Sequence, residues 1–597
     1  MFAGIVLYLL ALPPTGLWWL GWFVAAFWSP LIRRQSLVML SQDTLNWDWN
    51  ETRLKKVAKT KKTGKYWFKC RPYRQIWVAG LVFWLIAVHW VCFPYWATCF
   101  GWFAMSCYLA IYFPLFVFFA RSIHHTRFFG KFRIPVCVAG PIAWVATAFL
   151  QKHLMGGFAF ASLEHTQMHQ TYLIQIADLM GEYGVGAVMI FVGLLIGDVF
   201  PTWIWHDRLP ESLYAAVTEC DVFLRKSWRG FALRSFVLLL TFCTLILYGH
   251  TKLMFTERHY GPSKEIRVAL LQGDDRAVLN APTDWYDKVY EHFLTLARET
   301  TAADPTIDLV IWPESTCIHY WVDYDCSGLS PTQKAIVSPE KIDGFLRKYR
   351  LEFKSLARQV GIPQILGIPS LIKFLPSETE ASYNSALLID ENGMAKARYD
   401  KMLLVMFGEY VPLADWLPDG FFLKTLCQRA DFGKQPVCFP LRSKNDPDAA
   451  PVIASLNICF ESVSPQLIRN QVLALRRQGS EPDLLINISN DGWFRHSSQI
   501  DMHLATHVFR AVENRKPYLT ATNGGFSAYI NSSGEIIVCG ERQKRMAVVA
   551  DVITVQRTPC YHIVGDWPAF LILCFAIVIG LTKVSGVFCG IASDTNL

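Results

Sequence analysis

The sequence predicts a multi-span α-helical membrane domain joined to an α/β extracytoplasmic domain. Of the 597 residues, 52% are hydrophobic and 14% aromatic, and the mean hydropathy of +0.24 lies above the values of most soluble chains. Apolar runs near the length of about 20 residues that a bilayer requires fill much of residues 1–250 and recur near the C-terminus. Between them, strand-like runs alternate with helical patterns, which is typical of a layered α/β domain.

The membrane domain is predicted to occupy residues 1–250 and to contain about six spans. The first lies within residues 1–33, where the dipeptide Pro13-Pro14 interrupts the apolar run. The other apolar runs that are long enough to cross a bilayer lie at roughly 75–95, 98–120, 132–150, 183–203 and 231–250, and residues 563–597 supply a last span at about 567–590. The segment 158–184 is apolar with polar interruptions, which indicates a re-entrant or interfacial element beneath the α/β domain.

The loops between these spans predict the orientation. The loops 34–74, 121–133 and 204–230 are basic, whereas 151–182 is not. Basic loops stay in the cytoplasm, so residues 251–566 are expected outside and tethered to the bilayer at both ends. The net charge of +8 comes from residues that cluster beside apolar runs. It therefore indicates membrane-flanking charge, and we expect no nucleic-acid partner.

The α/β domain is predicted to span residues 251–562. Strand patterns occur at 266–272, 307–312, 364–368, 384–390, 452–458 and 483–489. Helical periodicity occurs at 284–300, 340–360, 465–478 and 499–515. Because reactive groups of such domains lie at strand ends, the polar residues that follow these strands are the candidates for chemistry.

Three such residues are Glu314, Lys401 and Cys459. A thiol must lose its proton to attack an acyl carbon, a carboxylate can accept that proton, and an ammonium can stabilise the oxyanion that develops. Taken singly, each has a plainer interpretation: a buried core thiol, a helix-capping carboxylate and a solvated lysine. Seven of the sixteen cysteines lie between residues 260 and 562, and an odd number leaves at least one without an internal partner.

Together with their neighbours these residues form an ordered set of motifs. The motifs are Trp312-Pro313-Glu314, Lys401 with Phe407-Gly408-Glu409-Tyr410-Val411-Pro412, Cys459-Phe460-Glu461 and Ser489-Asn490-Asp491-Gly492-Trp493-Phe494. This set resembles the nitrilase (carbon–nitrogen hydrolase) superfamily, and the multi-span region makes the chain similar to the apolipoprotein N-acyltransferases. The resemblance implies an α-β-β-α sandwich. Phe460, Met406 and Arg495 depart from the usual family residues, which leaves substrate preference open.

The resemblance also implies an activity. Cys459 would take the sn-1 acyl chain of a phospholipid as a thioester and pass it to the α-amine of a diacylglyceryl-apolipoprotein. Glu314 would act as base and Lys401 as charge stabiliser. The implied supporting residues are Glu409 and Glu461, and the implied substrate-binding residues are Trp285, Phe407 and Tyr410. No cofactor is implied, and we expect a monomer in a bacterial inner membrane with its catalytic domain on the periplasmic side.

Three other interpretations fit the sequence less well. His503 and His507 are four residues apart but lack the glutamate of a zinc-protease motif, so we predict packing or hydrogen bonding and no metal site. A membrane-anchored nitrilase-type amidase that hydrolyses a small amide would not need so many spans. A transporter or scaffold with a decayed hydrolase domain would show charges within the spans, where only Asp198 stands near one end.

Overall fold

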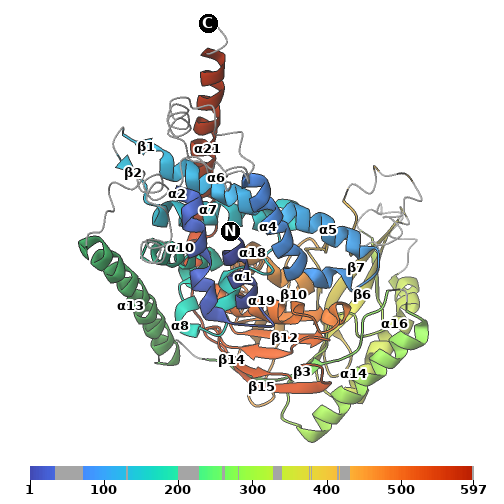
Figure 1. Cartoon of the computed structure of the whole chain (residues 1–597). Coiled ribbons are helices and arrows are strands. Elements are labelled where there is room, and N and C mark those ends of the chain that lie inside the picture. The colour runs from blue at the N-terminus through green and yellow to red at the C-terminus, as the bar shows by residue number, and fades with distance from the viewer. Residues whose placement is uncertain are drawn as a thin grey trace, which may run out of the picture.

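The structure is a computed structural model. It describes residues 1–33, 72–129, 132–199, 228–258, 263–279, 281–326, 339–375, 377, 379–412, 416, 418 and 430–593. An N-terminal helical region packs against an α/β domain, and the C-terminal helix α21 (Trp567–Ser593) returns to the helical region (Figure 1). This arrangement confirms the predicted fold class. The predicted basic loops 34–74 and 204–230 lie almost wholly outside the described residues.

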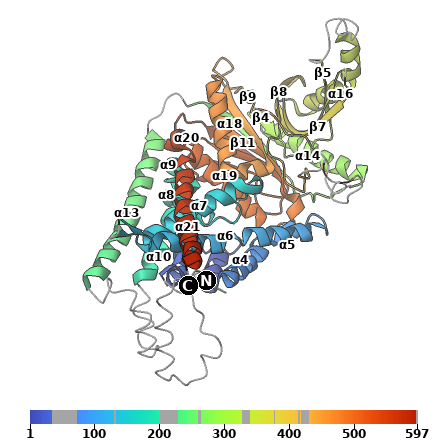
Figure 2. The ribbon, with the colours of Figure 1, turned by 90° about the horizontal axis from the view of Figure 1, so that it is seen from above.

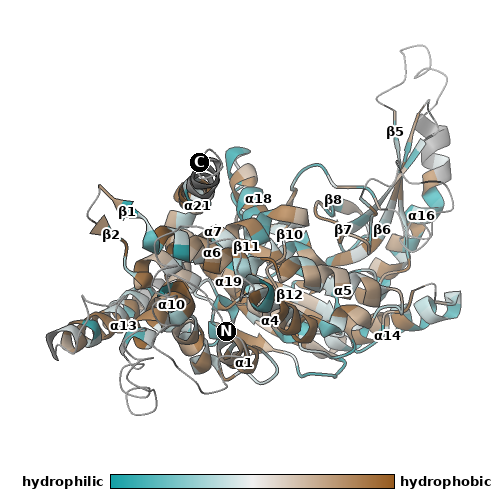
Figure 3. Cartoon of the chain, turned by 45° about the horizontal axis from the view of Figure 1, so that its top comes forward, coloured by the Kyte–Doolittle hydropathy of each residue, from teal (hydrophilic) through white to brown (hydrophobic). Residues whose placement is uncertain are grey.

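The helical region is built from apolar helices that bury aromatic side chains against one another. Helix α10 packs on both η1 and α7, and α21 packs on α6 and α7. Figure 3 shows the hydrophobic colouring of these helices. The elements are α1 (Phe2–Ala11), η1 (Trp18–Trp28), α2 (Ser29–Arg33), α4 (Pro72–Ala87), α5 (Thr98–Leu109), α6 (Tyr112–His125), α7 (Val136–His153), η7 (Glu164–Gln167), α8 (Thr171–Ile174), α9 (Ala177–Met180), α10 (Glu182–Val199) and α13 (Trp228–Arg258).

Among the described residues, two stretches are long and apolar enough to cross a membrane: Thr98–His125 and Gly230–Met254. A third is present if Thr171–Met180 and Glu182–Asp198, which meet at a bend of 120°, count as one broken span. The helices near residues 2–11, 73–87 and 567–583 are apolar but shorter. The protein is therefore a membrane protein with few candidate spans, and the larger number of predicted spans stays a prediction.

Two β-sheets lie face to face in the α/β domain. One has the order β14-β13-β12-β11-β10-β9 and the other the order β15-β3-β4-β6-β7-β8, with β5 paired to β6. The strands of the first sheet are β9 (Cys438–Leu441), β10 (Val452–Ile458), β11 (Leu484–Asn490), β12 (Tyr518–Asn523), β13 (Ala528–Ile530) and β14 (Ile536–Cys539). Those of the second are β3 (Glu265–Gln272), β4 (Leu309–Ile311), β5 (Trp321–Asp325), β6 (Gln364–Phe374), β7 (Thr379–Ile389), β8 (Ala395–Asp400) and β15 (Met546–Ile553).

Helices cover the outer faces of both sheets, which gives the implied α-β-β-α sandwich. Inward residues such as Leu270, Leu456 and Ile486 form the core between the sheets. Helices α14 (Thr283–Ala303) and α16 (Pro339–Val360) cover the second sheet. Helices α18 (Pro465–Arg477) and α19 (Gln499–Asn514) cover the first, and their apolar side chains belong to the same cluster as those of the membrane helices. The views along two directions show α14 and α16 on the side of the domain away from α13 (Figures 1 and 2).

Helix α19 is enclosed on all sides, and every residue in it except Asp501 is buried. A helix buried all round is normally apolar, yet α19 carries ionisable side chains that must therefore be paired. Arg510 lies 2.7 Å from Glu182 of α10 and 3.0 Å from Glu513. Glu182 also lies 2.5 Å from Lys152 of α7. Charges thus join the α/β domain to the helical region.

Candidate active site

The candidate nucleophile sits at a sharp turn. Strand β10 ends at Ile458, and Cys459 begins the short helix η9 (Cys459–Val463) with a φ of 52°. A non-glycine residue in the left-handed region costs of order 1–3 kcal/mol and persists only where the surroundings enforce it. Cys459 is a free, half-buried thiol at the end of a central strand. This is the position at which the sequence predicts a reactive group.

The other two candidates meet in one buried ion pair. Glu314 follows β4, Lys401 follows β8, and Lys401 Nζ lies 3.0 Å from Glu314 Oε1. Both side chains are buried. Asn384 Nδ2 donates to Glu314 Oε1 at 2.6 Å, and the backbone amide of Asn490 donates to Glu314 Oε2 at 3.0 Å. The carboxylate is therefore fixed in position by one ammonium and two further donors.

The electrostatics of the thiol follow from this arrangement. Burial and the nearby Glu314 carboxylate raise the pKa of the Cys459 thiol well above its usual value, and Lys401 opposes that rise. Burial opposes the charge of Lys401, but Glu314 and Glu409 raise the pKa of its ammonium well above the ordinary value. At neutral pH the Cys459 thiol therefore keeps its proton and Lys401 keeps its positive charge. Such a thiol attacks only when a base removes its proton.

We expect two charge-neutralising variants to change alkylation of Cys459 in opposite directions. Glu314→Gln removes a charge that raises the thiol pKa, so Cys459 should react faster with iodoacetamide at pH 8. Lys401→Gln removes a charge that lowers that pKa and should slow the reaction. Each unit of pKa corresponds to roughly tenfold in thiolate. Mass spectrometry of the Cys459 peptide measures the rates against pH, and shifts of the same sign would contradict this account.

The two predicted supporting carboxylates hold the loop that carries Lys401. Glu409 Oε1 lies 2.8 Å from Lys401 Nζ, and its other oxygen accepts from the amide of Val405 at 2.8 Å. Glu461 is fully buried. Its carboxylate accepts hydrogen bonds from the hydroxyl of Tyr399 and from the backbone amides of Met402, Leu403 and Ile458. Glu461 thus ties the loop after Lys401 to the turn at Cys459.

Burial raises the pKa of Glu461 to about 7, and the amides of Ile458 and Leu403 oppose that rise.

The predicted substrate-binding residues are more peripheral. Phe407 is 51% exposed and lies in the same loop as Glu409, where its amide donates to the carbonyl of Tyr410 at 2.7 Å. The ring of Tyr410 packs edge-on against Phe432 at 5.0 Å. Trp285 is half-buried in the first turn of α14. Their roles in binding stay predictions.

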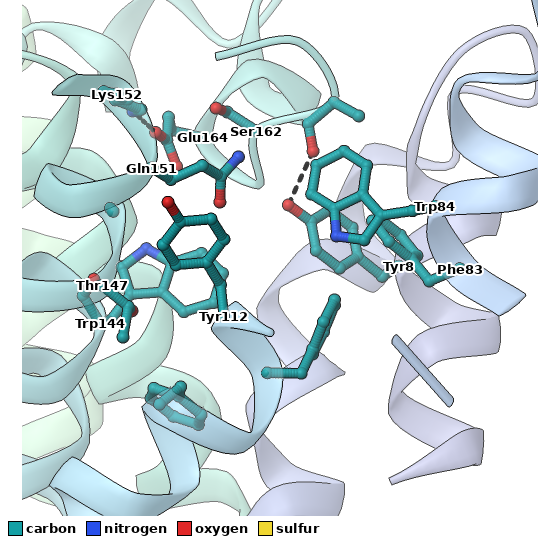
Figure 4. Close-up of a pocket in the computed structure, with 14 residues that line it drawn as sticks. Tyr8, Phe83, Trp84, Tyr112, Trp144, Thr147, Gln151, Lys152, Ser162 and Glu164 are labelled. Atoms are coloured by element: carbon teal, nitrogen blue, oxygen red, sulfur yellow. Dashed lines mark hydrogen bonds and ion pairs between the residues drawn. The ribbon is translucent and has the colours of Figure 1, made fainter. Parts of the chain in front are cut away.

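A cavity of about 40 Å³ lies within the helical region (Figure 4). Half of its lining residues are aromatic, among them Tyr8, Trp84 and Tyr112, and the Lys152–Glu164 ion pair lies on one side. A second hollow is bordered by Lys152, Phe158 and Phe460, the residue after the nucleophile. Lys152 lines both spaces. Residues of the helical region, among them Lys152 and Phe158, therefore lie beside Phe460.

Several residues at the site have only a weak signal in the sequence. Asn384 bridges Glu314 and Glu409 but lies within an ordinary strand pattern. His503 bonds to Asp491 and to the carbonyl of Cys459, and His507 stacks on Tyr518 at 4.9 Å. These contacts confirm the prediction of hydrogen bonding and packing for the two histidines.

Two family models match the chain. The carbon-nitrogen hydrolase model matches residues 267–558, and the model of the apolipoprotein N-acyltransferase N-terminal domain matches residues 65–195. The first covers the α/β domain, including all three candidate residues, and the second covers helices from α4 to α10.

Similar proteins match over both regions. An apolipoprotein N-acyltransferase of Geobacter metallireducens is 29% identical over 430 residues, which cover 72% of this chain and 69% of that protein. One of Rhodopirellula baltica is 24% identical over 533 residues, covering 83% of this chain and 87% of that protein. The similarity thus extends across the junction between the helical region and the α/β domain.

Proposed function

The chain belongs to the apolipoprotein N-acyltransferase family of carbon-nitrogen hydrolases, and we propose that it transfers an acyl chain from a phospholipid to the amino terminus of a diacylglyceryl-apolipoprotein. The observation that carries the proposal is the buried Glu314–Lys401 pair, whose charges act on the thiol of Cys459. A base, a fixed cation and a thiol in one place are the groups that thiol-based acyl transfer requires.

In the first half of the reaction, Cys459 Sγ attacks the carbonyl carbon of the sn-1 ester. The thiol proton passes to Glu314. This proton transfer is necessary because the raised pKa keeps the thiol protonated. Lys401 Nζ stabilises the negative charge that develops on the carbonyl oxygen. The ester C–O bond then breaks, the lysophospholipid oxygen takes the proton from Glu314, and a thioester remains on Cys459.

In the second half, the free amine of the S-diacylglyceryl-cysteine attacks the thioester. An α-amine has an ordinary pKa of about 8 and is largely protonated at neutral pH, so the attack uses its neutral fraction. Glu314 accepts the proton that the nitrogen loses, the C–S bond breaks, and Glu314 returns the proton to the thiolate. The products are an amide and the free thiol.

The surroundings of the site suit a lipid donor. Apolar side chains such as Phe158 and Phe460 lie beside the turn that carries Cys459, and sites for apolar ligands are lined mainly by such side chains. The protein acts in a bacterial inner membrane with the α/β domain on the periplasmic side, as the basic loops predict. It needs no cofactor for these steps and works as a monomer.

Vesicles with acyl-labelled phosphatidylethanolamine test the proposal. The purified full-length protein should acquire label that hydroxylamine releases, because hydroxylamine cleaves thioesters, and Cys459→Ala should acquire none. Addition of a diacylglyceryl-lipopeptide should then move the label to the peptide. Label that persists in Cys459→Ala would contradict the nucleophile, whereas ammonia release from small amides without any lipid adduct would favour an amidase instead.

A further inference from the structure

Three donors converge on the backbone carbonyl of Cys459. Ser462 Oγ, Asn487 Nδ2 and His503 Nε2 each lie 3.2 Å from this oxygen. A carbonyl oxygen has two lone pairs, so three converging donors restrict the plane of the peptide closely. This is the peptide whose orientation defines the left-handed turn at the nucleophile. Of the three, His503 is the ionisable one.

His503 has a polar partner on each ring nitrogen. Its Nδ1 lies 3.0 Å from one oxygen of Asp491 and 3.1 Å from the other. Ser489 Oγ and Gln499 Nε2 donate to Asp491, which leaves the carboxylate as the acceptor for Nδ1–H. His503 Nε2 lies 2.9 Å from Ser462 Oγ and 3.2 Å from the carbonyl oxygen of Cys459. His503 therefore links the Asp491 carboxylate to the Ser462 hydroxyl and to the nucleophile's own carbonyl.

The charged groups around His503 favour its protonated form. Asp491 faces it from η10 (Asp491–Phe494), Glu314 acts on it from the loop after β4, and His507 lies one turn along α19 with ring centroids 4.5 Å apart. Burial opposes the charge, but Asp491 and the Cys459 carbonyl raise the pKa of His503 above its usual value. His503 and Asp491 are both almost fully buried, so solvent screens the pair little.

We propose that His503, held by Asp491, is a positioning residue that fixes the Cys459 turn so that the thiol faces Glu314 and Lys401. The inference rests on the proposed acyl transfer, and it adds a second carboxylate-linked group to the site. The pair touches the backbone of the nucleophile and no reacting atom. Because misplacing a reacting group by about 1 Å can cost 10²-fold in rate, loss of this restraint should slow acylation without weakening lipid binding.

The test compares His503→Gln with His507→Gln in the full-length protein. His507 is a matched control because it is buried one turn away on the same helix and stacks on Tyr518 instead of bonding to Cys459. We expect His503→Gln to lower the single-turnover rate constant of thioester formation by about 10²-fold. The half-saturating phosphatidylethanolamine concentration should stay unchanged, and the thermal midpoint should fall no further than in His507→Gln.

Asp491→Asn provides an independent variant if His503→Gln fails to fold. It should reproduce the loss of rate, and the double variant should be no slower than the slower single variant, because the two side chains act as one unit. Wild-type rates in His503→Gln or Asp491→Asn, or fully additive losses, would overturn the inference. In each of these outcomes the wild-type protein still forms its thioester adduct. Failure of the wild-type protein to form any adduct would instead overturn the proposed function.

Discussion

Replacement of Glu314 by glutamine is expected to lower the rate of acyl transfer by about 10²–10⁴-fold, the range that general-base catalysis contributes. The amide keeps the size of the side chain and can still face Asn384 and Lys401, but it cannot accept the thiol proton. Thioester formation from labelled phosphatidylethanolamine under single-turnover conditions measures the effect.

Glu391→Gln is the matched control, because it removes one charge from the same domain at an exposed turn. It should keep the wild-type rate. The same Glu314 variant should react faster with iodoacetamide at Cys459, since the thiol pKa falls when the carboxylate is removed. A Glu314→Gln protein that keeps wild-type acylation would contradict the assignment of this residue as the base.

Replacement of Arg510 by methionine is expected to destabilise the protein by about 3–5 kcal/mol, the usual cost of breaking a buried ion pair. Arg510, Glu182 and Glu513 are all fully buried. Without the guanidinium, Glu513 loses its ion-pair partner and Glu182 keeps only Lys152 and His165. The thermal midpoint of the detergent-solubilised protein should fall by several degrees.

The control for that variant is Arg476→Met. Arg476 forms an ion pair with Glu481 at 3.3 Å, but its side chain is 43% exposed, and exposed pairs contribute roughly 0–1 kcal/mol. The thermal midpoint of Arg476→Met should therefore stay close to that of the wild-type protein. Equal midpoints for the Arg510 and Arg476 variants would show that the buried charges do not hold the α/β domain on the membrane helices.

Local patterns predict the central elements of the α/β domain well. The runs at 452–458 and 483–489 match β10 and β11 almost residue for residue, and the periodicity at 465–478 and 499–515 matches α18 and α19. These elements are buried and apolar on the faces that the pattern describes. Among the strands that the pattern does not reveal are β5, β9, β12, β13, β14 and β15. Short strands with mixed burial, such as β5, β9 and β14, carry little periodicity.

The residues of the site also divide into those that local patterns predict and those that only the structure reveals. Glu314, Lys401 and Cys459 follow strands, so the rule for strand ends finds them. The groups that orient them come from distant parts of the chain: the amide of Asn490 reaches Glu314 across 176 residues, and Arg510 reaches Glu182 across 328. Such pairings depend on tertiary packing, which no local spacing encodes.

The pairing of His503 with the Cys459 carbonyl likewise needs the structure, because the sequence indicates only that His503 lies on a helix.

The mass of the Cys459 peptide, taken from protein expressed in its native membrane, tests the account most directly. Tryptic cleavage after Lys444 and Arg469 gives a peptide in which Cys459 is the single cysteine. We expect a fraction of this peptide to carry the mass of a fatty acyl group, which hydroxylamine removes and Glu314→Gln abolishes. An unmodified peptide under these conditions, with the acyl group on another residue, would contradict Cys459 as the acyl carrier.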